Sequence, residues 1–159
     1  MVEIIRVDTP HALAAARALI QAHIEAHSQA HDSAATVKLL AALPTPYVPP
    51  AGGLWLAWDG AEAAGCVALH KVGPGIAELK RMYVRPASRG RGIARALAQH
   101  AILEARSMGY ERLRLGTLTT MHAAQHLYAS LGFRAIAPYR AVEFGDTLFY
   151  ELEIGTPTI

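Results

Sequence analysis

Residues 82–94 read MYVRPASRGRGIA, where a strand-like run passes through a glycine-rich turn into a helix. Gly90 and Gly92 let successive backbone N–H groups converge on one point. The N-terminus of the helix behind them adds roughly half a positive charge at the same place. The stretch therefore predicts a pyrophosphate site, with a mere tight turn as the alternative.

Three strand-like runs lead up to this turn. Asp59-Gly60 separates the first from the second, and Gly73-Pro74-Gly75 separates the second from the third. Both are strong turn signals, so the runs are expected to pair as an antiparallel meander. Their expected ranges are 54–58, 63–71 and 76–84.

The N-terminal part predicts one strand and two helices. Thr9-Pro10 is a typical helix start, because threonine caps helices and proline is favoured at the first helical position. Asp32 or Ser33 can cap the second helix, and the prolines that follow it cannot continue it. The expected elements are a strand over 2–7 and helices from 10 to about 28 and from about 32 to 43.

After the glycine-rich turn, the apolar spacing becomes helical and later returns to that of strands. Two helices are expected, which end at Gly109-Tyr110 and at Gly132-Phe133 by a left-handed stop. Thr119 or Thr120 can cap the second of them. Strands are expected over 112–117, 133–137 and 147–154.

This order predicts a single domain over residues 1–159, of α/β class and α+β type. We expect a mixed, mostly antiparallel sheet of six to seven strands flanked by about four helices. A dinucleotide-binding fold is the competing interpretation of the glycines. It is disfavoured because Arg95 stands where that motif needs its third glycine, and because an antiparallel meander comes before the turn.

Arg89, Gly92 and Ala94 match the Arg/Gln-x-x-Gly-x-Gly/Ala signature of the GNAT N-acetyltransferases, a superfamily that this chain resembles. The stretches ELKRMYVRP at 78–86 and AAQHLYASLGF at 123–133 stand in the order and spacing of that superfamily. The resemblance implies the GNAT fold and an acyltransferase that uses acetyl-CoA as co-substrate.

The resemblance also implies how the cofactor is held. The amides of residues 89–94 would hold the CoA pyrophosphate, nearby arginines would face the other phosphates, and the end of the preceding strand would pair with pantetheine. The expected cofactor-binding residues are Met82, Tyr83, Val84, Arg89, Gly90, Arg91, Gly92, Ile93, Ala94 and Arg95.

Two residues are candidates for catalysis, because acetyl transfer needs a neutral amine and a proton for the departing thiolate. By resemblance, Tyr128 is the donor to the sulfur; its ordinary pKa of about 10 keeps it protonated, and core packing is the alternative. Glu78 stands where some members carry a general base, and a surface ion pair is its alternative. Met121 departs from the family, because many members bind pantetheine with an asparagine there.

Composition excludes several other classes of function. The single cysteine, Cys66, lies in an apolar run and predicts a buried, inert thiol without any disulfide. The apolar runs are too short to span a membrane, and we expect a cytoplasmic protein. A net charge of +2 and the absence of aromatics interleaved with basic residues argue against nucleic acid. His23 and His27 lie one helical turn apart but have no matching carboxylate, so no metal is expected.

The expected function is transfer of an acetyl group from acetyl-CoA to a primary amine of a small molecule, by direct attack in a ternary complex. A peptide N-terminal acetyltransferase and a non-catalytic CoA-binding regulatory module are the alternatives. By resemblance, the acceptor site involves the first two helices and the last strands, and a homodimer through the final strands is compatible with the family. The residues these segments supply are His23, His27, His31, Asp32, Tyr47, Tyr139 and Glu143.

Overall fold

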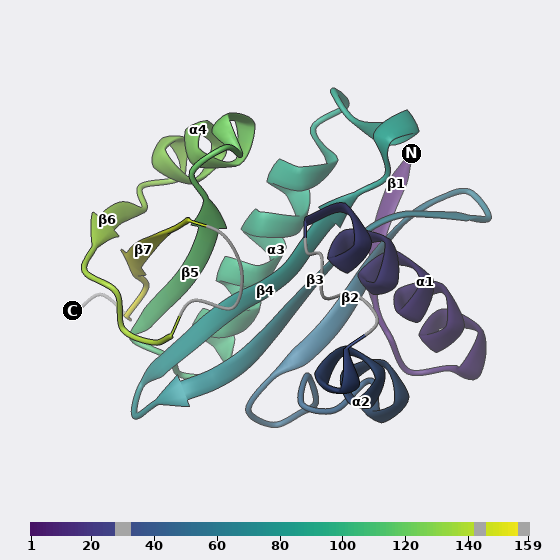
Figure 1. The fold of residues 1–159 in the computed structure, drawn as a ribbon, viewed down its shortest axis with the longest axis horizontal. Helices are drawn as coiled ribbons and strands as arrows, with labels where there is room; N and C mark the ends of the chain where they lie inside the picture. The colour runs from purple at the N-terminus through teal and green to yellow at the C-terminus, as the bar shows by residue number, and fades with distance from the viewer. Residues whose placement is uncertain (28–32, 142–145, 156–159) are drawn as a thin grey trace.

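The computed structural model describes residues 1–27, 33–141 and 146–155. Its centre is a seven-stranded sheet with the order β1-β2-β3-β4-β5-β7-β6 (Figure 1). Within the described residues β4 and β5 form the one parallel pair, and every other neighbouring pair is antiparallel. The predicted mixed, mostly antiparallel sheet is thereby confirmed. The strands are β1 Val2–Arg6, β2 Gly53–Asp59, β3 Glu62–Gly73, β4 Ile76–Val84, β5 Arg112–Leu118, β6 Arg134–Ile136 and β7 Thr147–Glu153.

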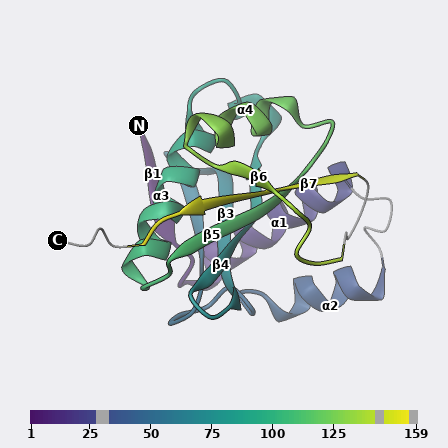
Figure 2. The same cartoon turned by 90° about the vertical axis from the view of Figure 1, so that its left-hand side faces the viewer.

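Helices cover both faces of the sheet. In Figure 2, α3 lies on one side of the strands and α1 and α2 lie on the other, and α4 packs into the same hydrophobic cluster as α3. None of the described helices is long and apolar enough to cross a membrane. The helices are α1 Pro10–His27, α2 Ala34–Ala42, α3 Ile93–Ser107 and α4 His122–Ser130, with a 3-10 turn at Pro86–Ser88.

The local signals at the helix ends account for most of these boundaries. The hydroxyl of Thr9 accepts a hydrogen bond from the N–H of Ala12 at 3.1 Å, and that of Ser33 accepts one from the N–H of Thr36 at 3.2 Å. Both are N-caps that satisfy an amide without a partner inside the helix. The cap expected for α4 was wrong, because Met121 occupies that position and no side chain caps the helix.

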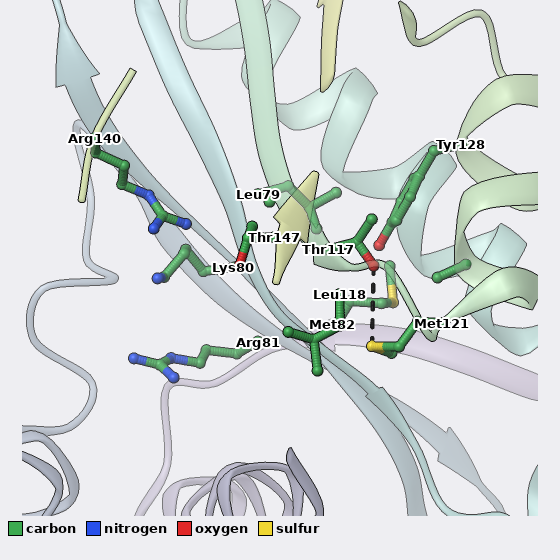
Figure 3. Close-up of a pocket in the computed structure, with 12 residues that line it drawn as sticks. Leu79, Lys80, Arg81, Met82, Thr117, Leu118, Met121, Tyr128, Arg140 and Thr147 are labelled. Atoms are coloured by element: carbon green, nitrogen blue, oxygen red, sulfur yellow. Dashed lines mark hydrogen bonds between the residues drawn. The ribbon is translucent and has the colours of Figure 1, made fainter. Parts of the chain in front are cut away.

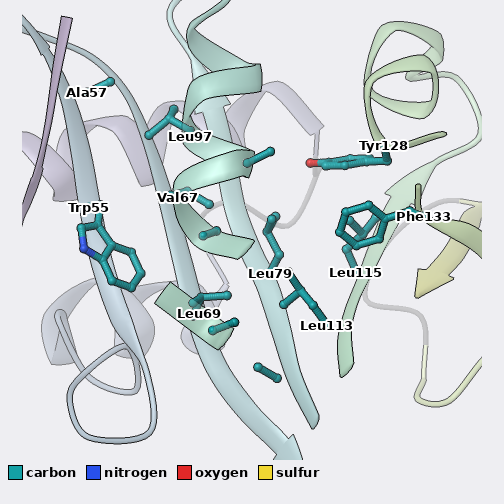
Figure 4. Close-up of a cluster of buried hydrophobic side chains, with 14 of the residues drawn as sticks. Trp55, Ala57, Val67, Leu69, Leu79, Leu97, Leu113, Leu115, Tyr128 and Phe133 are labelled. Carbon is teal, nitrogen blue, oxygen red and sulfur yellow. The ribbon is translucent and has the colours of Figure 1, made fainter. Parts of the chain in front are cut away.

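The core consists of two clusters, one on each face of the sheet. The cluster beneath α3 and α4 is shown in Figure 4, where Leu97 of α3 and Tyr128 of α4 approach the strands beside Leu79 and Leu115. The other cluster joins α1 to the opposite face, with Leu19 and other fully buried side chains. Truncation of such a buried leucine to alanine costs about 2–5 kcal/mol, so both helix layers are fixed firmly to the sheet.

The sheet opens between its two central strands. The ladder between β4 and β5 consists of three pairs, the last of which joins Glu78 to Arg114. Beyond Glu78, the register of β4 against β3 shifts between Cys66 and Ala68, and Arg81 adopts a left-handed φ of 56°. A bulge of this kind bends a strand away from its neighbour. The second half of β4 therefore leaves β5, and an opening forms between them.

Candidate active site

The glycine-rich turn presents a row of unpaired backbone amides. Gly90 and Gly92 both have a φ of 79°, which a residue with a Cβ rarely adopts, and Gly92 is the N-cap of α3. In the described part of the chain, no N–H from Gly90 to Arg95 donates to a backbone carbonyl. A Cβ at either glycine would meet no atom of the described residues within 4 Å, so those residues leave the space before the turn open. The turn is thus suited to an anion such as pyrophosphate.

A groove of about 690 Å³ runs from this turn along the end of β4 and the start of α4. It is lined by all the predicted cofactor-binding residues except Arg91, and by Tyr128. Sequence reasoning therefore found the residues of one continuous cavity. Arg91 does not line it, because its guanidinium donates to Asp59 across the surface at 2.7 Å. Contrary to the expectation from the sequence, the side chain of Arg91 does not line the groove.

The two other arginines of the turn lie at the rim of the groove. Arg89 donates from Nε to the carbonyl of Val84 at 3.0 Å, and Arg95 donates to the hydroxyl of Ser130 at 2.8 Å. His27 also lines the groove. Burial, and then the charge of nearby Arg89, lower the pKa of His27, which is therefore neutral at pH 7.

A second, smaller cavity of about 110 Å³ lies in the opening between β4 and β5 (Figure 3). It shares Met82, Met121, Ala124 and Tyr128 with the groove, so the two spaces meet at these side chains. Met121 lies at the junction where many family members carry asparagine, and it brings a thioether that accepts only weakly. At this junction a ligand in the groove could touch a ligand in the small cavity.

Tyr128 packs in the hydrophobic core and also lines both cavities. Its ring packs edge-on against Phe133 at 5.5 Å, and the side chain is only 4% exposed. Figure 3 shows the hydroxyl directed into the cavity, toward Thr117. Within residues 1–27, 33–141 and 146–155, no hydrogen bond to this hydroxyl is formed. Burial raises the pKa of Tyr128 above its ordinary value, so the hydroxyl keeps its proton at neutral pH.

Glu78 is a buried carboxylate surrounded by donors, not a surface residue. Its side chain is 1% exposed. Oε2 accepts hydrogen bonds from the Tyr139 hydroxyl and from Nε of Arg140, the latter at 2.8 Å, and Oε1 lies 3.0 Å from Nε2 of His70. Burial by itself would raise the pKa of Glu78, but the three hydrogen bonds outweigh it and lower the pKa to about 2. The carboxylate is therefore ionised at every physiological pH.

Sequence reasoning missed three residues that shape this region, namely His70, Arg81 and Arg140. His70 faces Glu78 across the β3–β4 ladder, and a correct register for the predicted meander would have indicated the pair. Arg81 lies in the stretch ELKRMYVRP, but nothing in that stretch marks it as a cavity residue, and Arg140 lies in no motif. Of the residues expected at the acceptor side, Tyr47 and Tyr139 do contact this network.

The histidines of α1 lie near the cofactor groove. The rings of His23 and His27 meet edge-on at 5.1 Å, and His23 also lies 5.8 Å from the Tyr83 ring. Among the described residues, no group of three or more His, Cys, Asp and Glu side chains could hold a metal ion. His31, Asp32 and Glu143 lie outside the described residues.

The sequence was compared with models of known protein families. The model of the Acetyltransferase (GNAT) family matches residues 14–133. This range includes the glycine-rich turn, and it includes β4 and α4, which line both cavities. The chain belongs to the GNAT family. It is accordingly an acyltransferase of the N-acetyltransferase type, and the resemblance noted in the sequence is confirmed.

Several relatives of this GNAT chain carry N-acetyltransferase names. It is 39% identical over 110 residues to the uncharacterized N-acetyltransferase C1271.07c of Schizosaccharomyces pombe, with 68% of each chain covered. It is also 39% identical over 94 residues to the uncharacterized N-acetyltransferase YsnE of Bacillus subtilis, covering 58% of this chain and 61% of YsnE. The chain thus spans about two thirds of these relatives' length.

Solved structures share the fold of this GNAT protein. An acetyltransferase of the GNAT family from Staphylococcus aureus has a TM-score of 0.82 at 20% identity, covering 97% of this chain and 99% of its own. The yncA protein of Salmonella typhimurium, solved with its cofactor acetyl-CoA, has a TM-score of 0.75 at 24% identity, covering 99% and 96%. At these identities the likeness establishes the fold.

Proposed function

We propose that this GNAT enzyme transfers an acetyl group from acetyl-CoA to a primary amine of a small molecule, by direct attack within a ternary complex. One observation carries the proposal: the groove behind the amide turn and the small cavity meet at Tyr128. A cofactor in the groove would bring its thioester to this junction, and an amine in the small cavity would reach the same point. The proposal treats the chain as one catalytic domain.

The cofactor half of the proposal rests on chemistry of the turn and of β4. The unpaired amides from Gly90 to Arg95 suit the pyrophosphate, and Met82 to Val84 offer backbone groups to the peptide-like pantetheine. The related yncA fold was solved with acetyl-CoA, which supports the same ligand here. The small volume of the second cavity favours a small acceptor over a polypeptide.

In the reaction, the amine nitrogen attacks the thioester carbonyl carbon, and the carbon–sulfur bond breaks. Tyr128 would give its proton to the leaving thiolate, because the hydroxyl is protonated at neutral pH and is aimed at the junction, and the tyrosinate would then regain a proton from solvent. A module that only binds CoA would need no proton donor at this junction, whereas transfer of the acetyl group does. This favours an active enzyme over the regulatory alternative.

Glu78 is the candidate for removing the proton from the amine, and it would act through a water molecule because the carboxylate is buried and lines neither cavity. Its pKa of about 2 makes it a weak base at neutral pH. His70 is half-buried and contacts Oε1, so it lies between the Glu78 carboxylate and the protein surface.

Calorimetric titration with acetyl-CoA, with NAD as control ligand, tests the cofactor. Saturable binding of acetyl-CoA alone supports the proposal, and its absence in a folded sample contradicts it. Turnover is then followed as free CoA thiol with a disulfide reagent. Cys66 should not interfere, because it is fully buried and burial raises its pKa to about 12.

A further inference from the structure

The small cavity carries an excess of positive charge. Three of its described lining residues, Lys80, Arg81 and Arg140, are basic, and none of the described ones is acidic. In Figure 3 the nitrogen-bearing ends of these three side chains gather on one side of the cavity, away from Tyr128. A molecule whose amine lies beside Tyr128 therefore extends its other end toward these cations.

Arg81 is the residue of this group whose position is hardest to explain by folding alone. Its φ of 56° is left-handed, which costs a residue with a side chain roughly 1–2 kcal/mol relative to glycine. The bulge is nevertheless held in place, since the thiol of Cys66 donates to the carbonyl of Arg81 at 3.1 Å. The result is a guanidinium that leaves the strand at the point where β4 opens from β5.

The guanidinium of Arg81 is oriented by a buried tyrosine. Nε donates to the hydroxyl of Tyr47 at 2.9 Å, and Tyr47 is only 3% exposed. The Tyr47 ring in turn packs edge-on against His70 at 5.9 Å. With Nε used in this way, the two Nη groups form a planar pair of donors, which matches the two oxygens of a carboxylate.

The two neighbouring cations, Arg140 and Lys80, have other contacts and act on a ligand mainly through their charge. Arg140 donates to Glu78, and Lys80 also has a partner, so the specific contact falls to Arg81. The three cations still outnumber the one described carboxylate, Glu78, that Arg140 contacts, so the cavity keeps a net positive charge and attracts an anion. The same charge repels acceptors with several positive charges, such as polyamines.

On the basis of the proposed function, we infer that the acceptor is an amine that also carries a carboxylate, and that the Nη groups of Arg81 bind this carboxylate. The amine then points to Tyr128 and the carboxylate to the basic side of the cavity. Arg81 is a binding residue in this arrangement, and Tyr47 is a positioning residue that acts through it.

The test is a panel of matched acceptors assayed by release of free CoA. The panel contains the common amino acids, β-alanine and γ-aminobutyrate, each compared with its carboxamide, and spermidine as a polycation. We expect at least one carboxylate-bearing amine to be acetylated with a kcat/KM at least tenfold above that of its carboxamide, and spermidine to be inactive. A panel in which no carboxylate form exceeds its carboxamide overturns the inference.

Substitutions of Arg81 and Tyr47 test whether the preference for a carboxylate acceptor depends on Arg81. Arg81→Gln is expected to raise KM for the carboxylate acceptor about 10- to 100-fold, since a charged hydrogen bond is lost, with KM for acetyl-CoA unchanged. Tyr47→Phe keeps the ring and removes only the orienting hydroxyl, so it should raise the same KM by less. Arg134→Gln on β6, which alters an exposed pair with Glu153 of β7, is the matched control.

The outcomes separate this inference from the proposed function. Failure of acetyl-CoA to bind contradicts the proposed function itself. Two other results contradict only the inference that the acceptor carries a carboxylate bound by Arg81. One is normal binding of acetyl-CoA with equal use of carboxylates and carboxamides, and the other is an unchanged KM for the acceptor in folded Arg81→Gln.

Discussion

Arg140 donates from Nε to Oε2 of Glu78 at 2.8 Å, and so joins two residues 62 positions apart in the chain. Glu78 is the last residue of β4 that pairs with β5, and Arg140 belongs to the segment between β6 and β7. The contact therefore closes the base of the opening in the sheet. A buried carboxylate that receives three hydrogen bonds thus holds the two sides of the candidate active site at a fixed separation.

The stability of the protein should depend on pH through Glu78. The folded-state pKa of about 2 is lower than the ordinary 4.5, so the ionised carboxylate stabilises the fold above about pH 4.5, and this stabilisation is lost as the pH falls toward 2. Its size is on the order of 3 kcal/mol. Glu78→Gln should lower the free energy of unfolding at pH 7 by about that amount.

Denaturant titrations between pH 7 and pH 2 measure this effect in both proteins. The difference between wild type and Glu78→Gln should shrink through the acid range. A difference that stays constant down to pH 2 would show that the Glu78 carboxylate does not titrate as described. Glu153→Gln, at an exposed pair on β7, is the control and should change little.

Tyr128→Phe should separate chemistry from binding. The ring packing against Phe133 is retained and no hydrogen bond to a described residue is lost, so the melting temperature should stay within a few degrees of wild type. Affinity for acetyl-CoA should be unchanged, whereas kcat should fall about 10²- to 10⁴-fold, the usual contribution of a general acid. An unchanged kcat would show that Tyr128 is not the proton donor and serves only in packing.

Gly92→Glu should abolish acetyl-CoA binding while the protein remains folded. The new Cβ meets no atom of the described residues within 4 Å, but the side chain places bulk and negative charge where the phosphates are proposed to lie. Gly60→Glu is the matched control, because Gly60 also has a left-handed φ, of 63°, with no atom near its Cβ, and lies in the turn between β2 and β3.

Both substitutions should cost a similar 1–2 kcal/mol of backbone strain. Loss of binding in Gly92→Glu alone, measured by calorimetry, assigns the turn to the cofactor. Equal affinities for acetyl-CoA in the two variants would show that the turn does not bind the pyrophosphate.

The parts of the fold set by neighbouring residues were predictable from the sequence. The bounds of β4 were predicted as observed, Ile76–Val84, because turn signals lie on one side and a proline on the other. The amide turn was predictable for the same reason, since two glycines and a helix start are all it needs. The resemblance to GNAT enzymes then added Tyr128, which the apolar spacing alone would have assigned to the core.

The acceptor side could not be predicted in this way. The contacts of Glu78 with Tyr139 and Arg140 arise from topology, which brings the segment after β6 against the middle of the sheet. The left-handed φ of Arg81 depends on the shift of register with β3, and no residue in the local sequence requires it. Met121 at the start of α4 likewise shows that packing decided a boundary where two threonines offered a cap.

The short ladder between β4 and β5 has a thermodynamic consequence for the enzyme. Past Glu78, no strand among the described residues pairs with β4 on that side, and the amide-rich arm of the proposed cofactor has the groups to take that place. The cofactor would then complete the sheet as well as supply the acetyl group. Its binding would add to the free energy of unfolding with the logarithm of its free concentration, so the lifetime of the folded enzyme would follow the supply of its own co-substrate.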